Sequence, residues 1–151
     1  LLLRGLDGLP TVLVNDSGIN SGFMIPQYTA ASLVSHNKVL CHPASVDSIP
    51  SCLGQEDHVS MGSISAIKLL EVLNNVEQVL AIEAFTAAQA LDFRKPLKAG
   101  RGVEAAHQEI RKRVSHKDAD EFFGDDIDAC IDMLRGNHIL KEVEKQIGKL
   151  Q

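Results

Sequence analysis

The sequence predicts a mainly α-helical protein organised as a bundle of long helices, and two observations carry this prediction. Hydrophobic residues make up 44% of the 151 residues, whereas aromatic residues make up only 4% and tryptophan is absent. A core of Leu, Ile, Val, Ala and Met is therefore expected, which suits packed helices. In addition, apolar residues over residues 61–93 recur at steps of three and four, the spacing of one face of a helix.

The first part of the chain is expected to be an irregular lead-in, residues 1–19, followed by a helix over residues 22–40. Within the lead-in, residues 11–14 (Thr-Val-Leu-Val) are β-prone and precede a turn signal. They predict either a short strand or an extended segment lying on a helical body. Asn20 or Ser21 is expected to cap the helix that follows.

The strongest helical pattern covers residues 61–93. Asp57 or Ser60 is expected to cap its N-terminus. Apolar residues cover more than half of its circumference, so we expect this helix to be largely buried. A helix of about 32 residues spans roughly 50 Å at 1.5 Å per residue, which is long for a domain of this length. The pattern therefore predicts a larger helical assembly.

Shorter helices are expected after a connector at residues 94–102. One should cover residues 103–115, a further turn should run through Phe123, and two more helices should complete the chain. Gly136 is expected to end the first of these two. The expected N-caps of these segments are Asp118 or Asp120, Asp125 or Asp126, and Asn137.

Composition argues against several classes of protein. The net charge of −5 argues against a general nucleic-acid binder, and the basic run at residues 111–113 is read as a solvated helix face. Three cysteines without a CxxC spacing fit a reducing cytoplasm, with Cys41 expected to be a buried thiol. No apolar run approaches the ~18 residues of a membrane span. The chain also lacks an initiator Met, so we expect it to be cut from something longer.

The longest segment that cannot form one regular element is the loop at residues 41–61. Pro43, Pro50 and Gly54 interrupt helices there. Loops held between rigid elements often carry binding and catalytic groups. The polar and charged side chains that this loop supplies are His42, Asp47, Gln55, Glu56, Asp57 and His58.

Two roles are open for Glu56 on the residues alone. In the first, Glu56 and Asp57 form an acidic first turn of the next helix, where the helix dipole favours negative charge. In the second, Glu56 lies in a pocket at the helix end, where burial raises its pKa and lets it exchange a proton or bond a polar substrate. Met24, in the first turn of the first helix, is read by residue type as core filler.

Metal sites and activated nucleophiles have little support in the pattern. The chain has six histidines but no HExxH, no zinc spacing of Cys and His, and no EF-hand loop, so no metal site is predicted. His42, Asp47, Glu56 and His58 would meet only through the folding of the loop. No GxSxG elbow marks a serine nucleophile.

Several ordered motifs point to a known family. They are residues 18–25 (GINSGFMI), 42–50 (HPASVDSIP), 55–62 (QEDHVSMG), 79–83 (VLAIE) and 89–93 (QALDF), with a tail at 125–127 and 134–135. Together they closely resemble the histidine ammonia-lyases of the aromatic amino acid lyase family. The resemblance covers essentially the whole chain, and the order and spacing of the motifs make it specific.

The resemblance implies that residues 1–151 are one helical segment, the C-terminal portion of a larger lyase subunit. It consists of the lead-in at 1–19, core helices at 20–93 with an active-site loop at 41–60, and short helices at 94–151. The family eliminates ammonia from L-histidine to give trans-urocanate, in histidine degradation. Its members are homotetramers with active sites assembled from more than one chain, and a cytoplasmic enzyme is expected.

The resemblance also implies a prosthetic group and two site residues. The family uses methylidene-imidazolone, made from an internal Ala-Ser-Gly, and no Ala-Ser-Gly occurs in these 151 residues. The chain is therefore expected to need the upstream part of the lyase and to be inactive alone. Glu56 matches the active-site glutamate that engages the imidazole or amino end of the substrate. Met24 matches a residue that lines the substrate pocket.

One departure from the family pattern lies just ahead of Glu56. Where the family usually reads Thr-Ser-Ala-Asn, residues 51–54 read Ser-Cys-Leu-Gly. Leu53 and Gly54 change the polarity and stiffness of the loop, which bears on the substrate. The alternatives are a histidine 2,3-aminomutase, a relative acting on another aromatic amino acid, and a helical assembly module without catalytic activity.

Overall fold

The computed structural model describes residues 8–46 and 48–150, and within these residues it contains helices and no strand. Two helices are long and three are short, with one 3-10 turn in the loop between the long ones. In chain order the elements are α1 (Met24–Leu40), η2 (Cys52–Gly54), α2 (Gly62–Asp92), α3 (Arg101–Arg111), α4 (Gly124–Arg135) and α5 (His138–Ile147). The predicted mainly α-helical class is confirmed.

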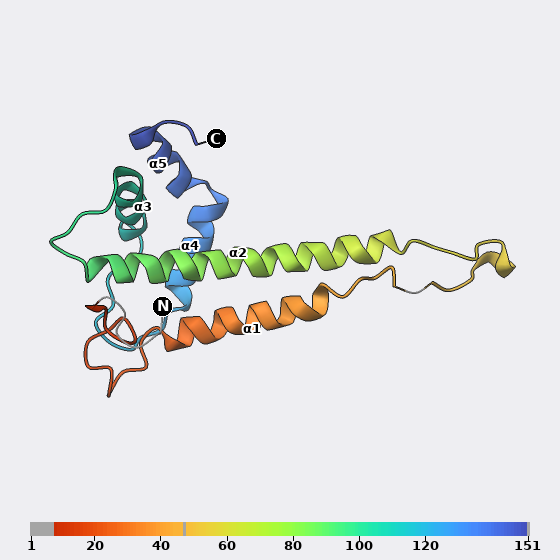
Figure 1. Ribbon diagram of the computed structural model, residues 1–151, viewed down its shortest axis with the longest axis horizontal. Helices are drawn as coiled ribbons and strands as arrows, with labels where there is room; N and C mark the ends of the chain where they lie inside the picture. The colour runs from red at the N-terminus through yellow and green to blue at the C-terminus, as the bar shows by residue number, and fades with distance from the viewer. Residues whose placement is uncertain (1–7, 47, 151) are drawn as a thin grey trace.

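The molecule has a compact end and a projecting arm (Figure 1). The arm consists of α1, the 41–61 loop and the first half of α2, residues 62–77, with the loop at its far tip. At the compact end, α4 packs across the second half of α2, and α3 lies against α5. At 1.5 Å per residue the 31 residues of α2 span roughly 46 Å, so this one helix connects the two parts.

The expectation that α2 is largely buried is wrong for its first half. Only Asn75 is buried before Ala81. Within this chain α1 is the helix that packs along the arm part of α2, and one neighbour covers only one stripe of a helix. Six apolar side chains of this half are between 40% and 69% exposed: Ile64, Ile67, Leu69, Leu70, Leu73 and Val76.

Aromatic side chains form the centre of the core at the compact end. The ring centroids of Phe23 and Phe85 are 4.7 Å apart, and Phe123 lies 5.4 Å and 5.8 Å from them. These rings bring the start of α1, the middle of α2 and the start of α4 together. The expected core of aliphatic residues and Met is therefore incomplete, because a few large rings fill space that would need many small side chains.

Residues 11–14 form a buried turn, so both the strand and the extended segment expected there are wrong. The backbone N–H of Leu13 donates to the carbonyl of Pro10 at 3.1 Å, and the φ of Leu13 is +56°. The fully buried amide of Gln89 holds this turn against the chain after α3. Its Nε2 donates to the carbonyls of Leu13 (2.8 Å) and Lys117 (2.7 Å), and its Oε1 accepts from the N–H of Lys117 (3.1 Å).

A side chain from a distant segment fixes the start of α1. The carboxylate of Asp120 accepts from the backbone N–H groups of Ser21 (2.9 Å) and Gly22 (2.6 Å). The expected caps Asn20 and Ser21 are wrong, since Asn20 instead accepts from the N–H of Asp120 at 3.1 Å. The expected turn through Phe123 is absent, because Asp120 serves α1 rather than a helix of its own.

The other expected side-chain caps also fail, although the helices themselves are present. No side chain caps α2, which begins after Met61, with a φ of +52°. Asp57 and Ser60 therefore do not cap it. Asp125 and Asp126 lie inside the first turn of α4, and Asn137 stands at the N-cap of α5 without a side-chain hydrogen bond. The capping patterns thus located the helix starts to within a few residues, but the side-chain hydrogen bonds expected at those starts are not formed.

Candidate functional site

The 41–61 loop ends in a hairpin that presents Glu56 at the tip of the arm. Two ties join its sides. The Oγ of Ser48 accepts from the N–H of Val59 at 2.8 Å. Nearer the tip, the N–H of Ser51 donates to the carbonyl of Glu56 at 2.9 Å, and the N–H of Glu56 donates back at 3.3 Å.

The turn between these ties has an unusual backbone. Cys52, Leu53 and Gly54 all have positive φ, at 51°, 58° and 84°. Such values are unfavourable for residues with a Cβ, so two of the three positions are strained. The side chain of Leu53 is fully exposed. The Leu-Gly departure from the family pattern thus lies at the outermost point of the arm.

Glu56 is exposed, and neither role considered from the sequence describes its position. The first turn of α2 contains no acidic residue, because α2 begins six residues after Glu56. Glu56 is also not buried in a pocket at the helix end by any of the residues that the structure describes. The carboxylate accepts a hydrogen bond from the Ser51 hydroxyl, at 3.0 Å to Oε2. Glu56 is therefore exposed on the hairpin, with its carboxylate bonded to Ser51 across the turn.

Met24, the second residue matched to the family site, lies at the other end of α1. It is the first residue of that helix and is 42% exposed. The 17 residues of α1 separate it from the 41–61 loop, a rise of roughly 25 Å. The structure therefore does not bring Met24 and Glu56 together within one chain (Figure 1).

The remaining polar groups of the loop do not form a metal centre. His42 and His58 are exposed, and Lys68 of α2 donates to the backbone carbonyl of His42. Asp47 lies outside the described residues. Over residues 8–46 and 48–150, no group of three or more His, Cys, Asp or Glu side chains is placed to hold a metal ion.

The three cysteines are free thiols in different surroundings. Cys41 and Cys52 are exposed, so the expectation of a buried Cys41 is wrong, because the end of α1 is not covered. Cys130, on the inner face of α4, is fully buried. Burial, together with the negative charge of Asp126, raises the pKa of the Cys130 thiol to about 11, so it is inert at neutral pH.

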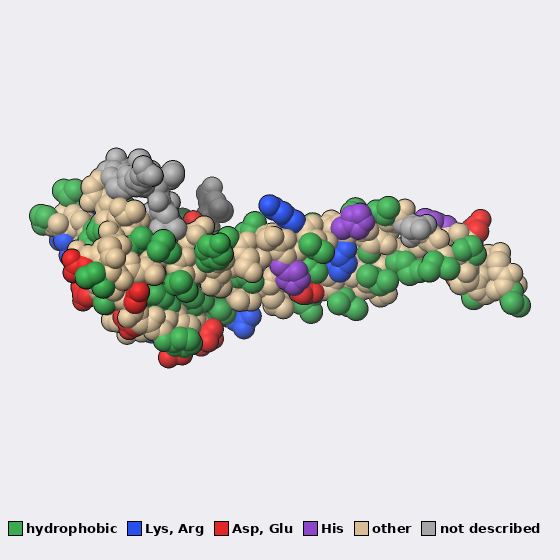
Figure 2. All heavy atoms as spheres, turned by 90° about the horizontal axis from the view of Figure 1, so that it is seen from below, with side chains coloured by type: hydrophobic (Ala, Val, Ile, Leu, Met, Phe, Trp, Pro, Cys, Tyr) green, Lys and Arg blue, Asp and Glu red, His purple; other side chains and the backbone are tan. Residues whose placement is uncertain are grey.

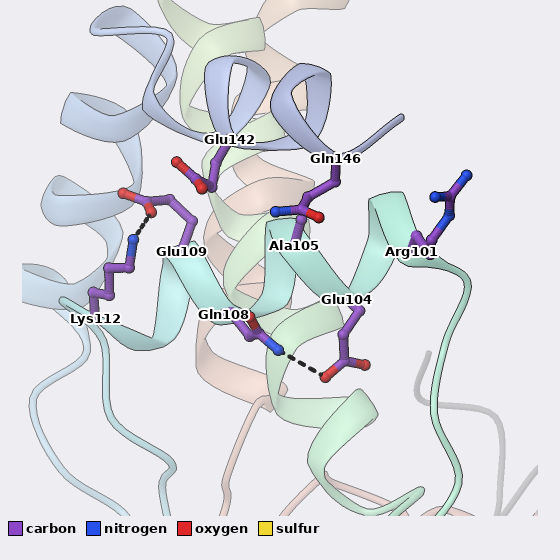
Figure 3. Close-up of a pocket in the computed structure, with 8 residues that line it drawn as sticks. All are labelled: Arg101, Glu104, Ala105, Gln108, Glu109, Lys112, Glu142 and Gln146. Carbon is purple, nitrogen blue, oxygen red and sulfur yellow. Dashed lines mark hydrogen bonds and ion pairs between the residues drawn. The ribbon is translucent and has the colours of Figure 1, made fainter. Parts of the chain in front are cut away.

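A groove between α3 and α5 is lined by charged and polar side chains and was considered as a site (Figure 3). It encloses about 230 Å³. Glu104 accepts from Gln108 at 3.2 Å, and Lys112 pairs with Glu109. Its polar side chains thus bond one another across single turns of α3. No pair in it resembles a nucleophile with its base, so we interpret the groove as a helix–helix seam.

A charged cluster around Asp92 was not predicted from the sequence. The Asp92 side chain is only 7% exposed at the end of α2. Its Oδ1 lies 3.1 Å from His107 Nε2 and 3.0 Å from Lys95 Nζ. Its Oδ2 lies 2.7 Å from the Arg111 guanidinium and 2.9 Å from His116 Nδ1. The basic run is therefore not wholly a solvated face, because Arg111 turns inward.

The electrostatics of this cluster favour the ionised carboxylate. Burial by itself raises the pKa of Asp92, but the hydrogen bonds from His116 and Lys95 and the charge of Arg111 outweigh it and hold that pKa well below its usual range. The cluster joins α2 to α3 and to the chain that follows. Because a saturated ion cluster has no open position, we interpret it as structural.

A model of the aromatic amino acid lyase family matches residues 1–112. The chain belongs to the aromatic amino acid lyase family. Among curated members, this chain is 52% identical over 144 residues to a histidine ammonia-lyase of Natranaerobius thermophilus and 55% identical over 143 residues to one of Caldanaerobacter subterraneus. Each match covers 95% of this chain and 28% of the relative.

Solved structures of the family share the fold of this lyase chain. It superposes on the crystal structure of histidine ammonia-lyase from Trypanosoma cruzi with a TM-score of 0.86 at 44% identity, covering 91% of this chain and 27% of that one. A tyrosine aminomutase from Streptomyces globisporus gives a TM-score of 0.90 at 36% identity, covering 99% and 29%. The similarity to histidine ammonia-lyases expected from the motifs is therefore confirmed.

The chain is much shorter than the relatives that it matches. The chain spans about 28% of the length of the curated relatives that it matches. Across residues 8–46 and 48–150, no helix is both long and apolar enough to cross a membrane. The activity of the whole protein therefore has to be proposed from the site.

Proposed function

We propose that these residues are the part of a histidine ammonia-lyase subunit that supplies the substrate-binding carboxylate Glu56. The reaction is the non-oxidative elimination of ammonia from L-histidine to give trans-urocanate. The single observation that carries the proposal is the exposure of Glu56 on a hairpin at the tip of the arm. The identity of about half of the residues to curated histidine ammonia-lyases supports the substrate.

A carboxylate at this position suits histidine as substrate. The imidazole and amino groups both carry N–H donors, and either can be positively charged, so an ionised glutamate can bind them by charge-assisted hydrogen bonds. A phenyl ring offers no such donor, and a charged group facing it would stay unpaired. Glu56 is therefore proposed to hold the imidazole or the amino end of histidine, and Met24 to line a pocket wall.

The substrate site is proposed to form between chains or between parts of a longer subunit. Met24 is the first residue of α1, whereas Glu56 lies in the loop beyond the other end of that helix. Apolar side chains continue along the arm (Figure 2), and those in the first half of α2 are exposed. Covering them releases water, at about 25 cal/mol per Å² of apolar surface. Further copies in a homotetramer are the proposed cover.

The family's prosthetic group, methylidene-imidazolone, does not fit the residues present here. It is made from Ala-Ser-Gly, and the two Ala-Ser pairs of this chain, at residues 31–32 and 44–45, are followed by Leu33 and Val46. These 151 residues therefore cannot form the group. Their proposed contribution is binding and orientation of the substrate, while the electrophile has to come from another part of the lyase.

The decisive test uses the complete lyase subunit, in which these residues are joined to a region with Ala-Ser-Gly. We expect it to convert histidine to a product that absorbs in the near ultraviolet. Glu56→Gln should lower turnover at least about a hundredfold, because the neutral amide cannot pair with a charged group. Asp57→Asn, which changes the adjacent exposed carboxylate, is the matched control and should cost much less.

Two results would contradict this proposal. A complete subunit that leaves histidine unchanged rules out the substrate. An unchanged rate for Glu56→Gln, with assembly intact by sedimentation, removes Glu56 from the site.

An aminomutase acting on another aromatic amino acid is the second candidate, favoured by the likeness to tyrosine aminomutase. The same complete subunit incubated with tyrosine distinguishes the two. A β-amino acid product would favour the aminomutase, and a near-ultraviolet product from histidine alone favours the lyase.

The proposed assembly is tested on the 151 residues by sedimentation. We expect association, because the arm exposes apolar residues over most of its length. A well-folded monomer would count against both the tetramer and a non-catalytic assembly module. The cytoplasmic location expected from the unpaired cysteines remains a prediction.

A further inference from the structure

We infer that Ser51 is a positioning residue, whose hydroxyl holds the Glu56 carboxylate in the orientation in which it meets the substrate. This inference rests on the proposed function, because it requires Glu56 to contact the substrate. It begins from a contact between two side chains at the arm tip. The Ser51 hydroxyl donates to Oε2 of Glu56 at 3.0 Å.

The backbone fixes the distance over which this hydroxyl acts. Ser51 and Glu56 exchange two main-chain hydrogen bonds, at 2.9 Å and 3.3 Å, so the two residues face each other across the hairpin. The carbonyl of Ser51 also accepts from the N–H of Gly54 at 3.0 Å. With both backbones held, the side-chain bond selects the rotamer of Glu56 rather than the fold of the loop.

The two oxygens of Glu56 are used differently. Oε2 is bonded to Ser51, whereas Oε1 accepts no hydrogen bond from the residues that the structure describes. An exposed glutamate samples several rotamers, and a binding partner has to restrict them at a cost in entropy. Because one oxygen is anchored before binding, the rotamer of the carboxylate is already restricted, which reduces this cost.

The strained turn gives a second, independent reason to assign a function to this pairing. Cys52 and Leu53 have positive φ although both carry a Cβ, and Leu53 is fully exposed, so the turn gains little from packing within this chain. Unfavourable backbone angles persist where the surrounding structure imposes them, and they concentrate at functional sites. What the turn achieves is the placement of Ser51 opposite Glu56.

Substitutions of Ser51 separate positioning from a merely structural role. Ser51→Ala removes the hydroxyl but keeps both main-chain bonds of the hairpin. Ser51→Thr keeps the hydroxyl. In the complete lyase subunit, we expect Ser51→Ala to lower kcat/KM for histidine roughly tenfold, the order expected for one hydrogen bond to a charged group. Ser51→Thr should stay within about twofold of wild type.

Ser48→Ala is the matched control, because the Ser48 hydroxyl bonds the main chain of Val59 in the same hairpin. Ser48→Ala should change kcat/KM less than about twofold, because it removes a hydrogen bond of the hairpin but not the bond to Glu56. Equal losses for Ser48→Ala and Ser51→Ala would mean that the hydroxyls only hold the loop, and would overturn the inference. Failure of Ser51→Thr to restore activity would overturn it too.

A double-variant cycle tests whether Ser51 acts through Glu56. In a Glu56→Ala background the hydroxyl has no carboxylate to hold, so Ser51→Ala should have no further effect on kcat/KM. Equal effects in both backgrounds would contradict the inference. If wild type is active and Glu56→Gln is impaired but Ser51→Ala is not, the positioning role of Ser51 is overturned while the proposed function stands. A wild type inactive on histidine would overturn both.

Discussion

Replacing Asp92 with Asn should destabilise the chain strongly, because it leaves Arg111 and Lys95 without their shared anion and two histidines without a carboxylate partner. The carboxylate is 7% exposed, and the side chains of Arg111 and His107 are 15% and 14% exposed, so water cannot replace the lost carboxylate at these two. Lys95, 71% exposed, will simply return to solvent. Asn also turns an N–H₂ group toward neighbours that are themselves donors.

The magnitude follows from which partners stay buried. Breaking a buried ion pair by removing one partner costs about 3–5 kcal/mol. Because part of this cluster is open to solvent, we take the lower value, about 3 kcal/mol. For a chain of this length that corresponds to a fall in Tm of roughly 6–12 °C. Urea and thermal unfolding followed by circular dichroism at 222 nm measure it.

Glu77→Gln is the matched control, since it makes the same carboxylate-to-amide change on the same helix. Glu77 pairs with Arg135 at 2.6 Å, in an exposed position where water screens the charges. We expect a clearly smaller loss of stability than for Asp92→Asn. Equal losses, or no loss for Asp92→Asn, would refute the conclusion that the cluster joins α2 to α3.

The same variant predicts a pH dependence with a definite sign. The pKa of Asp92 is lower in the folded chain than the ordinary value of about 3.9. Its contribution is therefore complete above about pH 4 and is lost as the pH falls through the lowered pKa. The difference in unfolding free energy between wild type and Asp92→Asn should hold at neutral pH and shrink in acid. A difference that grows in acid would contradict this.

Three further substitutions test the compact end and the hairpin. Gln89→Leu should cost about 3 kcal/mol of unfolding free energy, because buried backbone groups of Leu13 and Lys117 lose their partners; urea unfolding measures it, and a neutral result would contradict it. Gly22→Ala should cost about 2 kcal/mol or more, because its φ is +52° and a Cβ would lie 2.5 Å from a backbone carbonyl oxygen. Gly54→Ala should cost only about 1 kcal/mol, since its φ is +84° but nothing lies within 4 Å; equal losses would refute the steric argument.

Much of the fold was predictable because helices are local. The apolar spacing in residues 61–93 predicted α2 (Gly62–Asp92) to within a residue at each end. The first helix and the last two were also located closely. Side-chain caps were not, because the segment just before α1 is held by Asp120, about a hundred residues away, and not by a local cap. A contact of that range leaves no trace in local sequence patterns.

The candidate site shows the same division. The family was already evident from ordered sequence motifs around Glu56, and the family model and relatives confirm it. The sequence did not reveal the bond from Ser51 to Glu56, because that bond depends on three consecutive positive φ angles in residues 52–54. Nor did it reveal the Asp92 cluster, whose members come from the end of α2 and from residues that follow it.

The arm and its loop show most clearly which features local sequence predicts and which depend on helix packing. The sequence determined that a helix-breaking loop separates two helices, because Pro and Gly act locally. The packing of the helices, in contrast, places the loop at the tip of an arm, with Glu56 exposed and Met24 at the far end of α1. The physical reason is that direction and burial depend on which helices pack together, a property of the whole chain and its neighbours.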